Sequence, residues 1–357
     1  MEKNSVIEYK CPCCNAGLRF DAKSGNLVCD YCDNVYTTEQ MEEIEEAHLH
    51  EASGSESLEW DAYHGETVEG LTEYVCESCG ARVTGDETTA ATFCVYCGNP
   101  VVLRGKVEGE WKPDFVIPFK LTEKEAKEKL RAFYKGKILL PSGFKDESNF
   151  EKIKGIYVPF WLFDCDTHAK ASYNTTRVTT WHSGNYRYTK TSHYLVQREA
   201  DLSFERIPVD ASEKMDDSYM DALEPFHYDE MVPFDPTYFP GFFADRYDVS
   251  DTDSKPRAAD RVLATAETKL RETVHGYATV VKKTSGAHTK KSNVHYAMLP
   301  VYVLNTKYRD KNYLFMMNGQ TGKMVGKLPV SFGRAAALFG GIAAVVMAIA
   351  QLFIFLL

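Results

Sequence analysis

The strongest constraint on this chain is an apolar run near its C-terminal end, from Ala335 to Leu357. The run contains no charged residue, and Gln351 is its only strongly polar one. About 20 apolar helical residues cross the roughly 30 Å hydrocarbon core of a bilayer, where backbone groups must pair within the segment. A buried core helix is the alternative, but core helices rarely lack a polar face. The run therefore predicts a transmembrane helix over 334–357.

The residues before this run predict its orientation. Lys323, Lys327 and Arg334 precede it, and the positive-inside rule places such a flank in the cytoplasm. Residues 1–14 have no apolar stretch of the kind found in a signal peptide. We therefore expect a tail-anchored, single-pass protein of the cell membrane whose body lies in the cytoplasm.

The cysteines form an internal repeat. The spacing C-x2-C-x14-C-x2-C occurs twice. In a reducing cytosol such pairs bind metal more often than they form disulfides. Each C-x2-C knuckle points two thiolates at one ion, and two knuckles complete a tetrahedral site of four thiolates. The pattern predicts two zinc ribbons, each with one structural Zn²⁺, whose ligands are Cys11, Cys14, Cys29 and Cys32 in the first and Cys76, Cys79, Cys94 and Cys97 in the second.

Other interpretations of the cysteines have less support. Disulfides need an oxidising compartment, which the missing signal sequence opposes. A thioredoxin-type redox pair begins a helix in a βαβ unit, and no such context surrounds these pairs. Iron is the alternative ion for four thiolates. Cys13 is a surplus thiol that we interpret as a bystander, and Cys165 lies in an apolar run and is interpreted as a buried side chain.

The predicted fold class is α+β, with two small zinc ribbons, a β-rich body with a few helices, and one C-terminal transmembrane helix. Thr37 and Gln40 have the spacing of a capping box and predict a short helix there. A stretch after this helix is acidic and is interpreted as a flexible linker. The segments are ribbon 1 at 1–36, the short helix and acidic linker at 37–73, ribbon 2 at 74–104, the body at 105–331 and the transmembrane helix at 334–357.

Within the body, periodicity predicts several elements. Alternation over 172–196 with Gly184 near its centre predicts a β-hairpin. Asn318-Gly319 predicts a turn between two further strands. Helices are predicted over about 122–135 and 256–273, the second beginning with proline. Apolar strands near residues 115, 157 and 300 each contain a proline, so we expect them at sheet edges, at strand starts or with bulges.

Charge and motifs limit the function classes. The net charge is −10, and residues 33–75 hold thirteen Asp and Glu but no Lys or Arg. We find no basic stripe interleaved with aromatic residues, so nucleic-acid binding is disfavoured. The chain contains no G-x-S-x-G motif, no H-E-x-x-H motif and no phosphate loop followed by a helix. We therefore predict no catalytic residue, no small-molecule substrate and no cofactor besides the two zinc ions.

Several body segments, together with the two ribbons and the terminal anchor, carry a family likeness. They are GIYVPFWLFDCD (155–166), IPVDAS (207–212), EPFHYDEMVPFDPTYFPGFFADRYDV (224–249) and NGQTGKMVGKLPVS (318–331). The chain resembles the bacterial zinc-ribbon membrane proteins labelled TFIIB-type zinc ribbon-containing. The resemblance implies a cytoplasmic scaffold on the inner membrane, and some relatives are encoded beside phage-shock protein A and help to place it there. Its site residues carry over only at the eight cysteines.

These observations predict a non-enzymatic, membrane-anchored zinc-binding adaptor. Its partners are expected to be the lipid bilayer, through the C-terminal helix, and a cytosolic or membrane protein, with a phage-shock protein A-like protein as one candidate. In this view the two ribbons bind the partner, and the flexible linker between them extends their range. The alternative is a zinc-ribbon protein that binds nucleic acid, related to transcription or replication and tethered to the membrane.

Overall fold

The computed structural model describes most of the chain as two compact units. The described residues are 9–13, 16–22, 24–41, 44, 58–68, 72–85, 94, 96–97, 102–106, 110–145, 152–239, 242–308 and 311–356. Unit 1 comprises Met1–Ala62, Phe163–Ile207 and Lys255–Val294, and unit 2 comprises Tyr63–Leu162, Pro208–Ser254 and His295–Leu357. Three long strands contribute residues to both units: β10 (Lys154–Ser183), β11 (Tyr186–Asp210) and β14 (Thr279–Tyr308). The prediction of a mixed α+β fold with a sheet-rich body is confirmed.

Ribbon 1 in unit 1 is a small antiparallel sheet. Its strands are β1 (Arg19–Asp21), β2 (Asn26–Val28) and β3 (Val35–Tyr36), in that order. Residues 38–41 are helical, and the predicted capping box is present. The Gln40 amide N–H donates to the Thr37 hydroxyl at 3.2 Å, and the Thr37 N–H donates to the Gln40 side chain at 3.0 Å. Residues 45–50 of the predicted helix lie outside the described residues.

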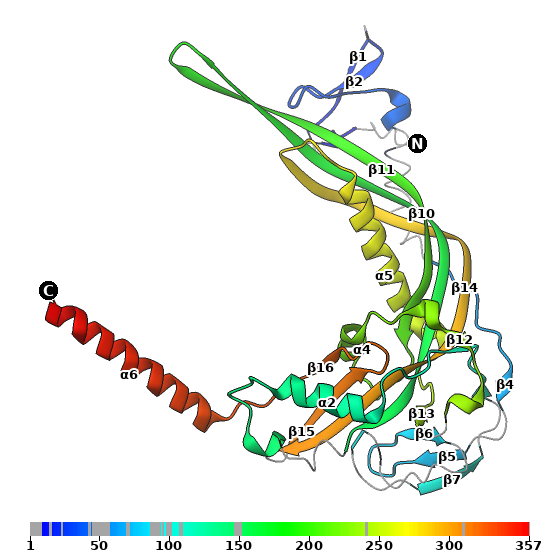
Figure 1. Ribbon diagram of the computed structural model, residues 1–357. Coiled ribbons are helices and arrows are strands. Elements are labelled where there is room, and N and C mark those ends of the chain that lie inside the picture. Colours follow the sequence, from blue (N-terminus) through cyan, green and yellow to red (C-terminus); the bar gives the residue numbers. More distant parts are fainter. Residues whose placement is uncertain are drawn as a thin grey trace, which may run out of the picture. The chain divides into compact units, whose positions relative to one another are not determined.

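The rest of unit 1 is an arm of long strands covered by one helix, α5 (Asp251–Glu272) (Figure 1). From Phe163 to Thr175 every second residue of β10 is buried, as period-2 alternation requires when only one face of a strand is covered. The helix buries Ala258, Val262, Ala266 and Leu270. It begins earlier than predicted, so Pro256 lies inside it. The reason is an N-terminal cap, since the Asp253 N–H donates to the Ser250 hydroxyl at 3.0 Å.

The predicted hairpin is present as β10 and β11, joined by Gly184-Asn185. Three side-chain contacts fix its register, because they join residues that lie directly opposite each other. They are Ser203 to Asp166 at 2.7 Å, His168 to Asp201 at 2.7 Å, and Lys170 to Glu199 at 3.5 Å. The same register places Trp181 across from Tyr188, and their rings stack with centroids 5.5 Å apart.

Unit 2 contains the remaining residues of the long strands, which are Lys154–Leu162 of β10, Pro208–Asp210 of β11 and His295–Tyr308 of β14. In an eleven-stranded sheet the main strand order is β12-β9-β14-β10-β13-β6-β5-β7. The short strands are β9 (Phe115–Val116), β12 (Val232–Pro233), β13 (Phe243–Asp245), β15 (Lys311–Asn318) and β16 (Met324–Gly326). β15 pairs with β14 and β16. The predicted Asn318-Gly319 turn is present where β15 ends and the loop to β16 begins. The strands that contain proline are predicted at sheet edges, at strand starts or with bulges. Pro159 in β10 and Pro300 in β14 lie inside interior strands, so the edge and strand-start alternatives are wrong for these two. Proline keeps its carbonyl, and these two carbonyls accept from Ala211 N at 3.0 Å and Gly319 N at 2.8 Å.

Helices cover this part of the sheet and complete two apolar cores. The predicted helix near 122–135 is α2 (Glu123–Tyr134), with a capping box between Thr122 and Glu125. One core includes Ala126 and Leu130 of this helix. The other includes Met220 and Leu223 of α4 (Asp217–Leu223). The remaining elements of the unit are η1 (Ser142–Lys145), η2 (Tyr228–Glu230), η3 (Pro236–Tyr238), the β4–β8 pair (Thr67–Val68 with Glu110–Trp111) and α6 (Phe332–Leu356).

Two features differ from the predicted arrangement of two separate ribbons joined by a flexible linker. Within the predicted linker, Leu58, Trp60 and Tyr63 are buried. Trp60 packs edge-on against Phe163, with ring centroids 5.4 Å apart. Ribbon 2 is also not separate from the sheet of the body. Its strands β5 (Thr72–Val75), β6 (Arg82–Gly85) and β7 (Val102–Lys106) belong to the eleven-stranded sheet, because β6 pairs with β13.

Candidate functional site

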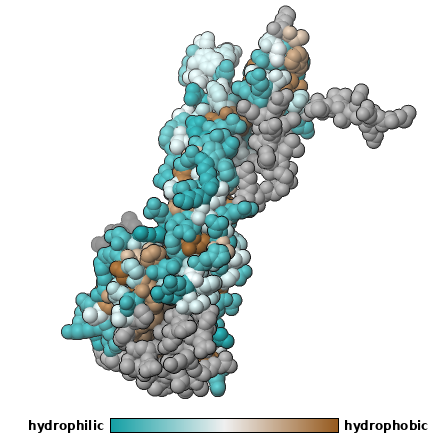
Figure 2. Space-filling model, turned by 90° about the vertical axis from the view of Figure 1, so that its right-hand side faces the viewer, coloured by the Kyte–Doolittle hydropathy of each residue, from teal (hydrophilic) through white to brown (hydrophobic). Residues whose placement is uncertain are grey.

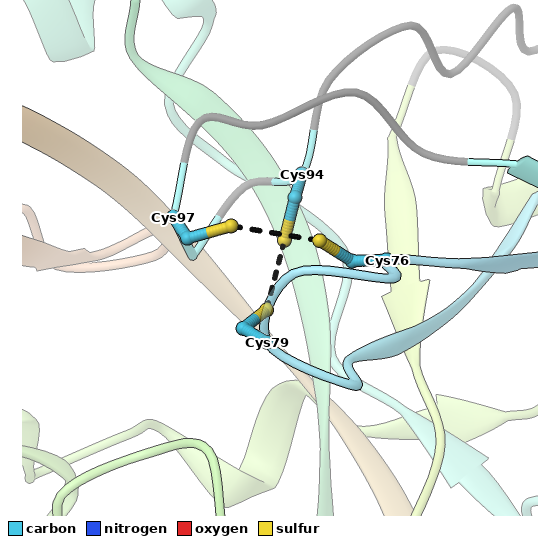
Figure 3. Close-up of side chains that lie close together, drawn as sticks. All are labelled: Cys76, Cys79, Cys94 and Cys97. Atoms are coloured by element: carbon cyan, nitrogen blue, oxygen red, sulfur yellow. Dashed lines mark hydrogen bonds between the residues drawn. The ribbon is translucent and has the colours of Figure 1, made fainter.

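Ribbon 2 gathers its four cysteines into one cluster (Figure 3). The sulfur atoms of Cys76, Cys79, Cys94 and Cys97 all lie within 4.8 Å of one another. Cys76 and Cys97 are 3.5 Å apart, and Cys79 and Cys94 are 3.6 Å apart. Cys76 and Cys94 are buried, whereas Cys79 is exposed. The predicted ligands of ribbon 2 are therefore brought together in space.

The distances in this cluster fit a shared metal ion. Tetrahedral thiolates at about 2.3 Å from zinc lie about 3.8 Å from one another. A disulfide needs a sulfur–sulfur distance of about 2.05 Å, and the described cysteines form no disulfide. Four soft thiolate donors suit zinc or iron. The residues present thus form a site able to hold one metal ion, with all four positions filled by protein ligands.

The same backbone turn shapes a knuckle in each ribbon. In ribbon 2 the Gly80 N–H donates to the Cys76 carbonyl at 2.8 Å, and Gly80 has φ of 70°. In ribbon 1 the Asp33 N–H donates to the Cys29 carbonyl at 2.9 Å, and Asp33 has φ of 59°. In each of these two knuckles, the residue four positions after the knuckle's first cysteine has a left-handed backbone conformation and closes the turn. Gly adopts this conformation freely, and Asp tolerates it.

Ribbon 1 brings together the sulfur atoms of Cys11, Cys29 and Cys32, which lie within 4.8 Å of one another. Cys11 and Cys32 are 3.5 Å apart. The fourth predicted ligand, Cys14, lies outside the described residues. Cys13 is not part of this group; its sulfur accepts a hydrogen bond from the Tyr36 hydroxyl at 3.1 Å. The described residues thus give ribbon 1 a second group of thiols able to hold a metal ion.

Burial and mutual hydrogen bonds change the acidity of these thiols. Burial is the largest influence on Cys76 and raises its pKa, but backbone N–H groups of Cys79 and Ser78, with the neighbouring thiols, lower the pKa overall. Burial also raises the pKa of Cys94 and of Cys13. Cys165 is buried in β10, where burial raises the pKa of its thiol to about 12. Cys165 is therefore a buried core residue, as predicted.

Ribbon 2 is also joined to the sheet through a residue that the sequence analysis did not select. Tyr96 lies between Cys94 and Cys97, and its hydroxyl donates a hydrogen bond to the buried carboxylate of Asp245. The Ser212 hydroxyl donates to the same carboxylate oxygen at 2.7 Å. Asn305 donates to the Tyr96 carbonyl. The only sequence signal for this contact is the repeated tyrosine before the last cysteine of each ribbon.

A polar cavity of about 460 Å³ lies beside this junction in unit 2. Its walls hold cations and carboxylates in close alternation, so its charge favours neither an anion nor a cation as a ligand. The charged lining residues are Arg82, Glu213, Lys214, Asp245, Arg246, Asp248 and Asp253.

The C-terminal helix has the properties predicted for a membrane span. Within α6, Phe332–Gln351 has a mean hydropathy of 1.9, and none of this stretch is buried in the protein. The helix is thus long and apolar enough to cross a membrane.

Comparison with known proteins gives one close match. Over 338 residues the chain is 35% identical to the uncharacterized protein YdjG of Bacillus subtilis (strain 168), covering 95% of this chain and 94% of the relative. The chain belongs to the YdjG family. Because the match spans nearly all of both proteins, YdjG and this chain share their overall organisation. No protein-family model and no solved structure matches the chain.

Proposed function

We propose that this member of the YdjG family is a non-enzymatic, membrane-anchored adaptor that binds a protein partner through unit 1. The observation that carries the proposal is where the exposed apolar side chains lie. Within the described part of the chain, exposed large hydrophobic residues occur in unit 1, in or next to α6, and at Ile138 of unit 2. Those of unit 1 are Phe20, Tyr31, Val35, Val178, Trp181, Tyr186, Tyr188, Tyr194 and Val281.

The end of the hairpin offers the best-formed binding surface. α5 ends at Glu272, and the Ala278 N–H already bonds to the Thr176 carbonyl at 2.7 Å. The hairpin beyond Arg177 therefore extends past the helix. Trp181 and Tyr188 are 46% and 45% exposed although their rings stack on each other. Exposed Trp and Tyr with few rotamers are the residues that most often dominate protein interfaces.

Cations lie on the same face of the hairpin as these aromatic rings. The sequence holds no Asp or Glu between Asp166 and Glu199, nor between Glu272 and Asp310. On the face that carries Trp181, the Arg177 guanidinium lies over the rings of Tyr194 and Tyr277, at 5.7 and 5.3 Å. Lys190 falls on the same face by the hairpin register. Such a surface complements an acidic patch on a partner.

Ribbon 1 adds to this surface within unit 1. The Asn34 side chain donates to the His193 carbonyl of β11 at 3.2 Å. Tyr31, between the last two cysteines of the ribbon, is 80% exposed. We infer that the bound ions are zinc and structural, because closed four-thiolate sites leave no position for a substrate. In this proposal zinc shapes ribbon 1, and ribbon 1 with the hairpin contacts the partner.

We further propose that α6 holds the protein at the cell membrane with its body in the cytoplasm. Lys323, Lys327 and Arg334 before the span support this orientation. The family resemblance suggests a phage-shock protein A-like partner. Figure 2 agrees with a water-exposed body, since hydrophilic residues cover most of the described surface on the face shown.

The test is a crosslinked pull-down with the full-length protein in detergent. Trp181→Ala with Tyr188→Ala should remove a defined partner protein from the captured set, whereas Thr180→Ala, on the other face of the hairpin, should not. Purified phage-shock protein A-like protein provides the direct test of the suggested partner. Equal capture by all variants would refute the role of the hairpin.

Single-stranded nucleic acid is the second candidate partner, because stacked aromatic rings beside cations also bind bases and phosphates. Salt separates the two. Salt weakens both, but phosphate-driven binding falls steeply with ionic strength, whereas binding of the protein partner loses only the contribution of the surface cations and keeps that of the buried aromatic rings. Recovery of nucleic acid that is lost in Trp181→Ala would favour this second candidate over the adaptor.

A further inference from the structure

The segment between α2 and η1 is fixed to the start of the apolar helix. The Ser331 N–H donates to the Leu139 carbonyl at 2.8 Å. The Arg334 guanidinium donates to the neighbouring carbonyl, that of Leu140. The Ala335 N–H in turn donates to the Ser331 carbonyl at 2.9 Å, so these bonds lie at the first turn of α6. Residues 135–140 therefore lie beside the first turn of α6, where the proposed membrane span begins.

This segment carries an apolar side chain that is exposed on the surface of the protein. Ile138 is 62% exposed, and Val330 and Phe332 at the start of α6 are 52% and 79% exposed. Among the described residues of unit 2 outside α6, Ile138 and Val330 are the two exposed large hydrophobic residues. Both lie at the base of the apolar helix rather than elsewhere on the unit. An apolar area in that position adjoins the hydrocarbon of the bilayer.

Cations flank the same apolar residues. Lys135 and Lys137 are exposed on either side of Gly136, just before Ile138. The Lys137 ammonium lies 5.5 Å from the centre of the Phe133 ring. From Lys135 to Lys145 the sequence contains no Asp or Glu. Apolar residues beside lysines are the pattern by which a surface segment binds the interface of an anionic membrane.

We propose that residues 135–138, with Val330 and Phe332, form a second membrane contact that binds anionic lipid. The inference rests on the proposed membrane span. Ile138, Val330 and Phe332 enter the boundary between headgroups and acyl chains, and Lys135 and Lys137 pair with anionic headgroups. Because the hydrogen bonds of Ser331 and Arg334 join this segment to the span, unit 2 sits directly on the membrane surface rather than hanging from a free tether.

The test uses the full-length protein in nanodiscs of phosphatidylcholine alone or with phosphatidylglycerol. A photo-crosslinking residue, p-benzoylphenylalanine, replaces Ile138 in one variant and the exposed Glu128 of α2 in the control. Mass spectrometry then counts lipid adducts. We expect adducts at position 138 to exceed those at 128 several-fold and to be enriched in phosphatidylglycerol. Lys135→Glu with Lys137→Glu should reduce that enrichment by about fivefold or more, whereas Lys124→Glu should leave it unchanged.

The outcomes separate this inference from the proposed function. If alkaline carbonate extracts the full-length protein from membranes, the membrane anchor itself fails. If the protein resists extraction but position 138 gives no more lipid adducts than 128, only the second contact fails. Crosslinking of position 138 to another protein chain would also overturn it, because a second copy would then cover the apolar residues. Adducts that are equal with both lipid mixtures would refute the anionic preference.

Discussion

The Tyr96 hydroxyl donates a hydrogen bond to the buried carboxylate of Asp245 and so joins a cysteine knuckle to the sheet of the body. The repeat places Tyr31 at the equivalent position in ribbon 1, where the side chain is 80% exposed. The same residue type in the same motif therefore has two environments. In ribbon 2 it connects the cysteine cluster to the rest of unit 2, and in ribbon 1 it faces solvent.

The first prediction compares these two tyrosines. Tyr96→Phe should lower the free energy of unfolding by about 1–3 kcal/mol, because it removes a donor to a buried acceptor. Tyr31→Phe should change it by no more than about 0.5 kcal/mol, as is usual for an exposed site. Chemical denaturation in detergent measures both, and elemental analysis should show unchanged metal content. An equal loss in both variants would argue against the special role of the Tyr96 contact.

The second prediction concerns pH. Burial is the main reason that the pKa of Asp245 is raised to about 7, and hydrogen bonds from Tyr96 and Ser212 oppose it. Between about pH 4 and 7 the unfolded chain has released this proton while the folded chain retains it. Stability therefore falls as pH rises through this window, by up to about 1.4 kcal/mol per pH unit.

Asp245→Asn should remove that slope. The stability of the variant relative to the unchanged protein should increase from pH 5.5 to 7 and level off above pH 7. Melting curves across this range measure the difference, with metal content followed in the same samples. A constant difference between the two proteins would show that Asp245 is ionised throughout.

The third prediction concerns the coupling of ribbon 2 to the body. Cys76→Ser should destabilise unit 2 as well as the ribbon, because β6 pairs with β13. Hydrogen exchange over residues 156–162 should show this loss, and the melting temperature of the unit should fall by about 5 °C or more. Cys11→Ser, the matched change in ribbon 1, should leave exchange in 156–162 unaltered. If only the ribbon residues lose protection in Cys76→Ser, ribbon 2 is an independent module.

The fourth prediction concerns metal content. Protein purified without oxygen should contain two zinc ions per chain, since each ribbon supplies a closed set of thiolates. Cys14→Ser should reduce the content to one, whereas Cys13→Ser should retain two. Inductively coupled plasma mass spectrometry measures this directly. Substantial iron, or one metal ion in Cys13→Ser, would change the assignment of ion or ligands.

The fifth prediction concerns topology. Protease added to intact spheroplasts should leave both ribbons and the body uncut, because the basic flank before α6 favours a cytoplasmic body. Lysed spheroplasts serve as the control in which the same sites are cleaved. Cleavage of the body in intact spheroplasts would place it outside the cytoplasm and contradict the proposed orientation.

The sequence predicted best those features that depend on neighbouring residues. The cysteine spacing placed Cys76, Cys79, Cys94 and Cys97 in one cluster because knuckle geometry is local. Thr37 and Gln40 gave the capping box of the short helix after ribbon 1 for the same reason. Alternation gave the hairpin about Gly184, since a strand covered on one face must alternate.

Features that depend on distant partners could not be predicted in this way. The burial of Trp60 depends on Phe163, and the environment of Tyr96 depends on Asp245. Neither partner is near in sequence. The basic and aromatic face of the hairpin was missed for another reason. Its residues alternate along two strands, so Arg177, Trp181 and Tyr188 form a surface only when the register is known.

The register of the hairpin also limits how its length can vary. Because Trp181 pairs with Tyr188 across a two-residue turn at Gly184-Asn185, a single inserted residue in either strand would turn every later side chain to the opposite face. The hairpin can therefore lengthen or shorten in relatives and keep this face only by matched changes of two residues, or a multiple of two, in both strands. Variation of that kind would alter how far the arm reaches and leave the chemistry of its face intact.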